Sequence, residues 1–334
     1  MPALEDAVDA IARDTGFSGV VRVDVPEGIE LAKAYGLADR AHAIGNTVDT
    51  RFAIASGMKG LTALTVVSLI DEGRLDLATT ARSVLGDDLP LIDDGVTIEH
   101  LLSHRSGIGD YLDEDAVGDI TDYAMGVSVH ELASTEQYLA VLGGHATAFS
   151  PGERFAYCNG GFIVLALIAE RTSGVEFHEL VRQRVCRPAA MSHTEFLRSD
   201  ELPGDAALGY LTDDSARTNV FHLPVMGGGD GGIYSTPADM RAFWDAVFAG
   251  RVVPERWVAE MVRPRSDVPD EEKRYGLGFW LHESSDVVML EGYDAGVSFR
   301  SMHDPISGVG ATVIANTSEG AWPFVELLEE RLAG

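Results

Sequence analysis

The pattern of apolar and polar positions predicts strands near both ends of the chain. Residues 21–25 alternate like a half-buried strand, and residues 29–35 read as its hairpin partner across the turn Pro26-Glu27-Gly28. Three later segments have a similar apolar and β-branched character: 275–282, 287–290 and 309–315. Strands from the two ends of a chain that share a sheet give an antiparallel sheet with helices on its faces.

Helical spacing accounts for most of the other apolar residues. The longest pattern follows Ser56, has apolar residues at 61, 64, 67, 69 and 70, and stops at Glu72-Gly73. Further helices are expected over 4–12, 97–104 and 160–170, after Thr236-Pro237, and from Trp322-Pro323 onward.

Helices and loops dominate the middle of the chain. We therefore predict an α+β fold, an antiparallel sheet flanked by helices, with an inserted all-helical lobe. The α/β lobe would be discontinuous, over 1–78 and 224–334, and the helical lobe would span 79–223. With 334 residues, of which 46% are hydrophobic, the chain can bury a sizeable core.

The net negative charge of the chain makes some classes of binding partner unfavourable. The chain has 53 acidic and 25 basic residues and a formal charge of −28. Nucleic acids and anionic membranes are poor partners for such a surface, because both attract positive charge. The first residues lack the pattern of a signal peptide, no apolar run is long enough to span a bilayer, and the only cysteines are Cys158 and Cys186. The expected location is the cytoplasm; the sequence does not indicate an oligomeric state.

Candidate chemistry begins at Ser56 and Lys59. If Ser56 opens a helix, the two side chains lie one turn apart on the same face. A serine hydroxyl is a poor nucleophile until a base is placed beside it, and the N–H groups of a helix N-terminus add positive partial charge there. Two other stretches are candidate partners: Tyr157 and Asn159 in a loop before a helix, and residues 291–296 at the end of a predicted strand.

With these motifs in order, the chain resembles the serine β-lactamase and penicillin-binding protein family, and within it the class C β-lactamases and related esterases and D-peptidases. The Ser-x-x-Lys pattern is part of that family's signature. The resemblance also covers residues 100–108, which are similar to the family's H-L-L-T-H-T-S-G-L, and the segments 151–159, 231–236 and 275–279.

The resemblance implies a role for each motif residue. Ser56 would be the nucleophile that is acylated, and Lys59 and Tyr157 would share the proton transfer. Asn159 would hold Lys59 and a substrate amide or carbonyl, and the backbone N–H groups of Ser56 and Gly296 would form the oxyanion hole. Two coupled groups titrate as a unit, so the sequence leaves the base unassigned between Lys59 and Tyr157. No metal and no organic cofactor are implied.

The third motif departs from the family. It reads Tyr293-Asp294-Ala295, where β-lactamases have Lys-Thr-Gly and many esterase-like members begin with His. The family lysine provides positive charge for a substrate carboxylate, and Tyr293 provides none, although Arg300 could restore it. We therefore expect a small neutral ester or amide as substrate. A β-lactamase or D-amino-acid peptidase, and a ligand-binding relative that does not turn over, remain as alternatives.

Several other residues have simpler interpretations. Cys158 fits a small buried residue better than a nucleophile, and His100 and His104 fit packing or loop-holding hydrogen bonds better than a zinc pair. His222, and Asp110 with Tyr111, either line the cleft or belong to ordinary loops. The glycine-rich run 227–232 lacks the Lys-Ser/Thr of a phosphate loop.

Overall fold

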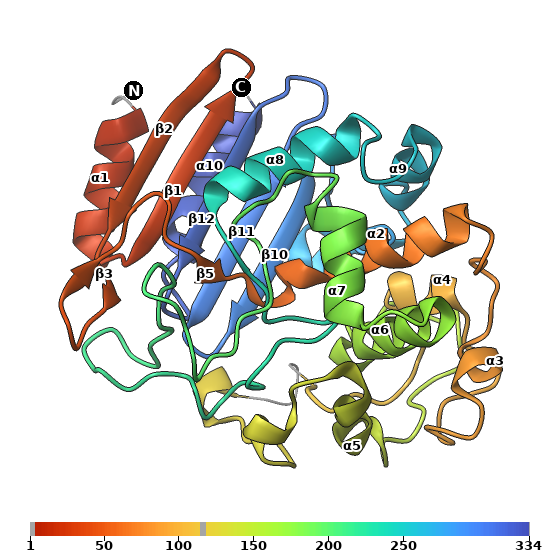
Figure 1. Ribbon diagram of the computed structural model, residues 1–334. Coiled ribbons are helices and arrows are strands. Elements are labelled where there is room, and N and C mark those ends of the chain that lie inside the picture. Colours follow the sequence, from red (N-terminus) through yellow and green to blue (C-terminus); the bar gives the residue numbers. More distant parts are fainter. Residues whose placement is uncertain (1–3, 114–117, 334) are drawn as a thin grey trace.

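One antiparallel sheet forms the centre of the protein in the computed structural model, which describes residues 4–113 and 118–333 (Figure 1). Its eight strands follow the order β2-β1-β12-β11-β10-β9-β8-β7. The strands of this sheet are β1 (Gly19–Val25), β2 (Gly28–Tyr35), β7 (Ser266–Val268), β8 (Lys273–Tyr275), β9 (Trp280–His282), β10 (Val288–Asp294), β11 (Val297–His303) and β12 (Gly310–Ala315). Two small sheets pair β3 (Leu37–Asp39) with β4 (Ile44–Gly45), and β5 (Phe52–Ala53) with β6 (Tyr234–Ser235).

The two ends of the chain meet inside this sheet, as the pattern predicted. Strand β1 pairs with β12, with Gly19 opposite Ala315 and Asp24 opposite Gly310. The α+β fold with an antiparallel sheet is confirmed. Strand β1 is not half-buried as expected, because Val20 and Val21, which point to opposite faces, are both fully buried.

Helices cover both faces of the sheet (Figure 1). The helices are α1 (Leu4–Thr15), α2 (Met58–Asp71), α3 (Ala81–Leu85), α4 (Ile98–Leu102), α5 (Leu139–Leu142), α6 (Asn159–Ser173), α7 (Phe177–Val181), α8 (Pro237–Phe248), α9 (Glu255–Met261) and α10 (Val325–Ala333). One apolar core lies between the sheet and α1 with α10, and a larger one lies on the opposite face around α2, α6 and α8. The division of the chain at residues 79 and 223 stays a prediction.

Helix ends follow the predicted chemistry. Thr97 accepts a hydrogen bond from the backbone N–H of His100 at the start of α4, and Thr236 accepts one from that of Asp239 at the start of α8. Helix α6 ends at Ser173 and is capped by Gly174, whose left-handed backbone (φ +71°) favours glycine. Helix α2 is buried along almost its whole length, so it is a central helix with no solvent face.

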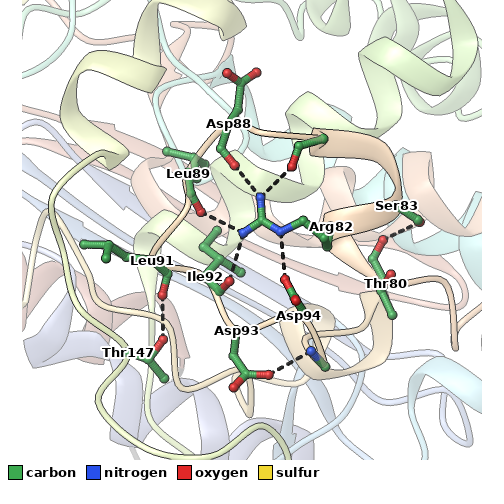
Figure 2. A network of polar contacts seen from close by, with 12 residues as sticks. Thr80, Arg82, Ser83, Asp88, Leu89, Leu91, Ile92, Asp93, Asp94 and Thr147 are labelled. Atoms are coloured by element: carbon green, nitrogen blue, oxygen red, sulfur yellow. Dashed lines mark hydrogen bonds and ion pairs between the residues drawn. The ribbon is translucent and has the colours of Figure 1, made fainter.

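A single arginine holds the loop that follows α3 (Figure 2). The guanidinium of Arg82 donates hydrogen bonds to the carbonyl oxygens of Gly86, Asp88, Leu89 and Ile92, at 2.7–3.0 Å, and to the carboxylate of Asp94. Backbone carbonyls of an irregular loop need donors when they are partly buried, and one rigid side chain provides them here. Nearby, Thr147 donates to the carbonyl of Leu91 and fastens the same loop to a later segment.

Across residues 4–113 and 118–333, none of the helices combines the length and the apolar character needed to cross a bilayer. The expectations about a leader segment concern residues 1–3 in part, which lie outside the described residues.

Candidate active site

Ser56 lies on a tight turn at the entrance to α2. Residues Ala55–Gly57 form one turn of 3-10 helix that runs directly into α2 at Met58, so Ser56 lies at the tip of the helical segment, as expected, but in its 3-10 turn. Ala55 has a left-handed backbone (φ +43°), which is costly for a residue with a side chain. The surrounding structure therefore imposes this turn, and Ser56 is left half-exposed on it.

Lys59 is buried one turn further along and reaches back to Ser56. Its Nζ donates hydrogen bonds to Ser56 Oγ at 2.7 Å, to Asn159 Oδ1 at 2.7 Å and to the backbone carbonyl of Asp230 at 2.9 Å. Only 2% of Lys59 is exposed. The three acceptors come from the 3-10 turn before α2, from α6 and from the glycine-rich run 227–232, so three separate segments fix the amine beside the hydroxyl.

Tyr157 joins the same group from the loop before α6. The centre of its ring lies 4.8 Å from Lys59 Nζ, within range of a cation–π contact. The ring is also parallel to that of Trp280, with 6.1 Å between their centres. The structure thus brings the predicted hydroxyl, amine and phenol side chains into one place.

Asn159 is the first residue of α6 and is held at both ends. Its side-chain Nδ2 donates to the carbonyl of Leu112 at 3.1 Å while Oδ1 accepts from Lys59, and only 3% of the residue is exposed. The carboxylate of Asp110 caps the helix by accepting from the backbone N–H groups of Asn159 at 2.5 Å and Gly160 at 2.8 Å. Burial raises the pKa of Asp110 to about 6, against the opposing effect of these N–H donors.

Asp230 was not predicted and completes the lysine's surroundings. Its carbonyl accepts from Lys59, and its carboxylate accepts a hydrogen bond from the hydroxyl of Tyr111. Burial raises the pKa of this carboxyl, although Lys59 opposes the shift. The neighbouring Gly229 explains the glycine run, since a Cβ there would lie 2.3 Å from the carbonyl of Phe162. The consecutive glycines are the sequence signal for this close backbone approach. From the sequence, the run was only excluded as a phosphate loop.

The third motif requires a correction. The N–H of Gly296 donates to Ser318 Oγ at 2.8 Å, and the carbonyl of Ala295 accepts from Asn219 Nδ2, so both residues belong to the turn between β10 and β11. Neither lines a cavity at Ser56. Gly292 instead packs against the turn that carries Ser56 (the nucleophile turn, residues 54–57), because a Cβ on Gly292 would lie 2.2 Å from the carbonyl oxygen of Ile54. The part of β10 beside Ser56 is therefore Gly292-Tyr293, which comes before the predicted oxyanion donor Gly296 in the sequence.

Tyr293 and Asp294 both lie at the cleft. The hydroxyl of Tyr293 donates to Glu319 at 2.9 Å; burial, and then this carboxylate, raise the pKa of Tyr293 to about 12. Arg300 does not restore the missing positive charge. It is buried on β11 between Glu291 and Glu329, and its neighbour Phe299 packs on Gly57, so Arg300 points to the opposite face of the sheet.

Two cavities meet at Ser56. One is walled by apolar side chains and by tyrosines 111, 123, 138, 234 and 293, and also holds His222, Asp230 and Asp294. The other runs past Tyr157 and Trp280 and carries Arg154 among four carboxylates: Asp113, Asp270, Glu271 and Glu291. The site thus offers one subsite rich in tyrosine, the aromatic cavity, and one acidic subsite, and Ser56 lines both.

The remaining candidates have structural roles. Burial holds the pKa of the Cys158 thiol well above its ordinary value, which keeps it from acting as a thiolate. The side chain of His100 accepts from the backbone N–H of Thr97 and so takes part in capping α4. Among the described residues, no group of three or more His, Cys, Asp or Glu side chains is arranged to hold a metal ion.

Comparison with known proteins agrees with this geometry. The model of the Beta-lactamase family matches residues 4–333. The crystal structure of a penicillin-binding protein from Bacillus halodurans superimposes with a TM-score of 0.88 and 35% identity, over 97% of this chain and 98% of that one. EstCE1, a hydrolase with promiscuous acyltransferase activity, is 19% identical over 99% of both chains with a TM-score of 0.80, which shows a shared fold.

Curated relatives are longer than this chain. A D-aminopeptidase from Brucella anthropi is 27% identical over 292 residues, which are 84% of this chain and 52% of that protein. PbpX of Bacillus subtilis (strain 168) is 26% identical over 277 residues, which are 82% of this chain and 64% of that protein. The chain therefore spans about half to two thirds of the length of these relatives.

Proposed function

Because the chain belongs to the Beta-lactamase family, a family of serine hydrolases, we propose that it is an esterase or amidase that hydrolyses small neutral substrates through an acyl-enzyme on Ser56. One observation carries the proposal. Lys59 Nζ donates to Ser56 Oγ at 2.7 Å while Asn159 and the carbonyl of Asp230 fix it in place. A nucleophile with an oriented basic partner is the requirement for covalent catalysis.

The reaction follows from this arrangement. Ser56 Oγ attacks the substrate carbonyl, and its proton passes to the coupled pair of Lys59 and Tyr157. The same pair returns a proton to the departing alcohol or amine when the ester or amide bond breaks. A water molecule then gives a proton to the pair and attacks the acyl-serine, which releases the acid and restores the hydroxyl. Backbone N–H groups on the nucleophile turn and on the facing strand β10 would stabilise the oxyanion.

The charge of the cleft supports a substrate without a carboxylate. Asp230 and Asp294 line the aromatic cavity, and four carboxylates and Arg154 line the acidic one. There, Lys273 pairs with Glu271 and Glu291 and leaves Asp113 and Asp270 to add negative charge. Like charges brought together at a binding site cost several kcal/mol. A penicillin or cephalosporin carboxylate would meet this field without the lysine that the family normally provides.

A substrate panel tests the proposal. The protein and its Ser56→Ala variant would be treated with a fluorophosphonate probe and then with short-chain aryl esters, neutral amides and a chromogenic cephalosporin. We expect labelling and ester turnover only when Ser56 is present, with much slower cephalosporin turnover. Cephalosporin hydrolysis as efficient as ester hydrolysis would make it a β-lactamase, and labelling without turnover would make it a binding relative.

A second candidate, hydrolysis of D-amino-acid amides or peptides, is favoured by a specific observation. The buried carboxylate of Asp230 and the nearby Asp294 suit the ammonium group of an amino-acid substrate. The similarity to the D-aminopeptidase of Brucella anthropi points the same way. Adding both enantiomers of an amino-acid anilide to the panel separates this activity from simple esterase activity: D-selective turnover that exceeds ester turnover would replace the first proposal.

A further inference from the structure

His104 contacts the two peptide units on either side of Tyr157. Its backbone carbonyl accepts the N–H of Ala156 at 2.8 Å, and its side-chain Nδ1 accepts the N–H of Cys158 at 3.0 Å. The backbone of His104 is left-handed (φ +54°), and this strained conformation allows one residue to present both acceptors. One residue thus fixes the chain immediately before and immediately after Tyr157.

The imidazole also packs against the phenol ring itself. The ring centres of His104 and Tyr157 are 4.3 Å apart, at an angle of 32°. Phe155 and Tyr275 lie edge-on to the imidazole, at 5.8 and 4.8 Å. His104 is only 1% exposed, and its Nε2 has no hydrogen-bond partner among the described residues. A buried polar atom without a partner is a cost that a purely space-filling residue would avoid.

The chemistry of these contacts defines the state of the ring. Since Nδ1 accepts a backbone N–H, the neutral imidazole carries its proton on Nε2. Burial, and then the charge of Lys59, hold the pKa of His104 well below its ordinary value. The titratable groups that face the ring are Lys59 from α2, Tyr157 from its own loop and Tyr275 from β8. A neutral ring therefore lies beside the phenol and leaves Lys59 as the cation next to it.

We propose that His104 is a positioning residue that sets the orientation of the Tyr157 phenol relative to Lys59 and Ser56. This inference rests on the proposed function, because it assigns His104 to the proton transfer of that reaction. A phenol displaced by about 1 Å would lose its alignment with the nucleophile, which in enzymes can lower the rate about 10²-fold.

Two substitutions divide the role of His104 into its parts. His104→Phe keeps a ring against Tyr157 and removes the acceptor for Cys158, whereas His104→Asn keeps an acceptor, tolerates the left-handed backbone and removes the ring. His42→Asn is the matched control, since the side chain of His42 is 75% exposed. Each variant would be compared with wild type in kcat, normalised to the sites titrated with fluorophosphonate, and in KM. The pH dependence of kcat and the thermal unfolding followed by circular dichroism would also be compared.

We expect both His104 variants to lose kcat, by as much as about 10²-fold, with KM changed by less than about threefold and with a shifted pH profile. His42→Asn should behave as wild type. A role confined to stability would lower the unfolding temperature and leave kcat per titrated site and the pH profile unchanged, and that result would overturn the proposal. If His104→Phe does not fold, His104→Asn decides by the same criteria.

A second readout does not depend on catalysis. Absorbance of the phenolate would be titrated with pH in wild type and in each His104 variant, and the curve of the matching Tyr157→Phe protein would be subtracted. We expect the Tyr157 inflection to move in both His104 variants; an unmoved inflection contradicts the proposal. Absence of Ser56-dependent turnover in wild type would instead defeat the proposed function and leave this titration as the test of His104.

Discussion

At the residue scale, the site depends on how Lys59 is held. Its amine donates to an amide oxygen and to a backbone carbonyl, and these two neutral acceptors place it against Ser56. An amine that must take and return a proton is better served by such partners than by a carboxylate, because a carboxylate would stabilise the charged form.

Replacing this amine should abolish most of the activity. In Lys59→Met, Ser56 loses its basic partner, and we expect kcat/KM for a short-chain aryl ester to fall by about 10²–10⁴-fold. Lys33→Met is the control, since Lys33 pairs with Asp9 and Glu5 far from the site. Activity of Lys59→Met close to that of wild type would show that Tyr157 alone provides the base.

Asp110 should make stability depend on pH in an unusual direction. The pKa of its carboxyl is about 6 in the folded protein, above the ordinary value of 3.8, so between these values the folded state binds more protons than the unfolded state. The contribution of Asp110 to stability is therefore full at low pH and is lost as the pH rises through about 6. Asp110→Asn should remove this contribution.

The measurement is urea unfolding of wild type and Asp110→Asn at pH 4.5 and pH 7. We expect the stability of wild type, relative to the variant, to be greater at pH 4.5 than at pH 7. The subtraction removes the effect of the other carboxylates, which titrate in both proteins. A difference between the two proteins that does not change with pH would mean that Asp110 titrates normally in the folded state.

Sequence reasoning at this scale identified Ser56, Lys59, Tyr157 and Asn159, because each lies in a short motif with its own chemistry. It did not find Asp230, whose contribution to Lys59 is a backbone carbonyl and leaves no mark on residue type. It also placed the oxyanion strand at Gly296. The register of a strand against a distant turn depends on tertiary packing, which no local pattern encodes.

At the element scale, the strand β11 shows what the hydrophobic pattern cannot reveal. All seven of its residues are buried, yet Ser298, Arg300 and Ser301 interrupt the apolar run, and no strand was predicted there. These polar groups are satisfied by partners outside the strand: Ser298 donates to the carbonyl of Thr317, and Arg300 pairs with Glu291 and Glu329. Strands β1, β2 and β12 and helices α1, α8 and α10 were predicted because their patterns are local.

The loop clamped by Arg82 is an element whose stability should rest on one side chain. In Arg82→Met, four backbone carbonyls lose the donor that Arg82 provides, although that of Leu89 still accepts the N–H of Ile92. We expect the free energy of unfolding to fall by about 2–4 kcal/mol. The measurement is urea unfolding at pH 7. Ester turnover per titrated site should be unchanged, because none of these residues lines the cavities at Ser56.

Asp94→Asn provides the matched control for this clamp. It removes only the carboxylate partner of Arg82. The side chain of Asp94 is 86% exposed, and exposed ion pairs contribute about 0–1 kcal/mol. If the two substitutions cost the same, the ion pair and not the set of carbonyl contacts holds the loop.

At the scale of the whole molecule, the charge of −28 should be a destabilising force. Repulsion among 53 acidic residues is only partly offset by 25 basic ones. Raising sodium chloride from about 10 mM to about 1 M shortens the screening length from about 30 Å to about 3 Å. We therefore expect the thermal unfolding temperature to rise with salt. Potassium chloride should give the same curve, and a falling temperature would show that attractive ion pairs outweigh the repulsion.

The pairing of β1 with β12 has a consequence for biosynthesis. The ribosome completes Ser56, α2 and the hairpin of β1 with β2 early, but β12, which pairs with the other edge of β1 (Gly19 opposite Ala315), is made much later. A nascent polypeptide therefore carries its nucleophile, while the residues up to β12 are still being made, without the complete β-sheet that aligns it. The site should become competent only after β12 has been made, and chains released before β12 should be inactive and prone to aggregate.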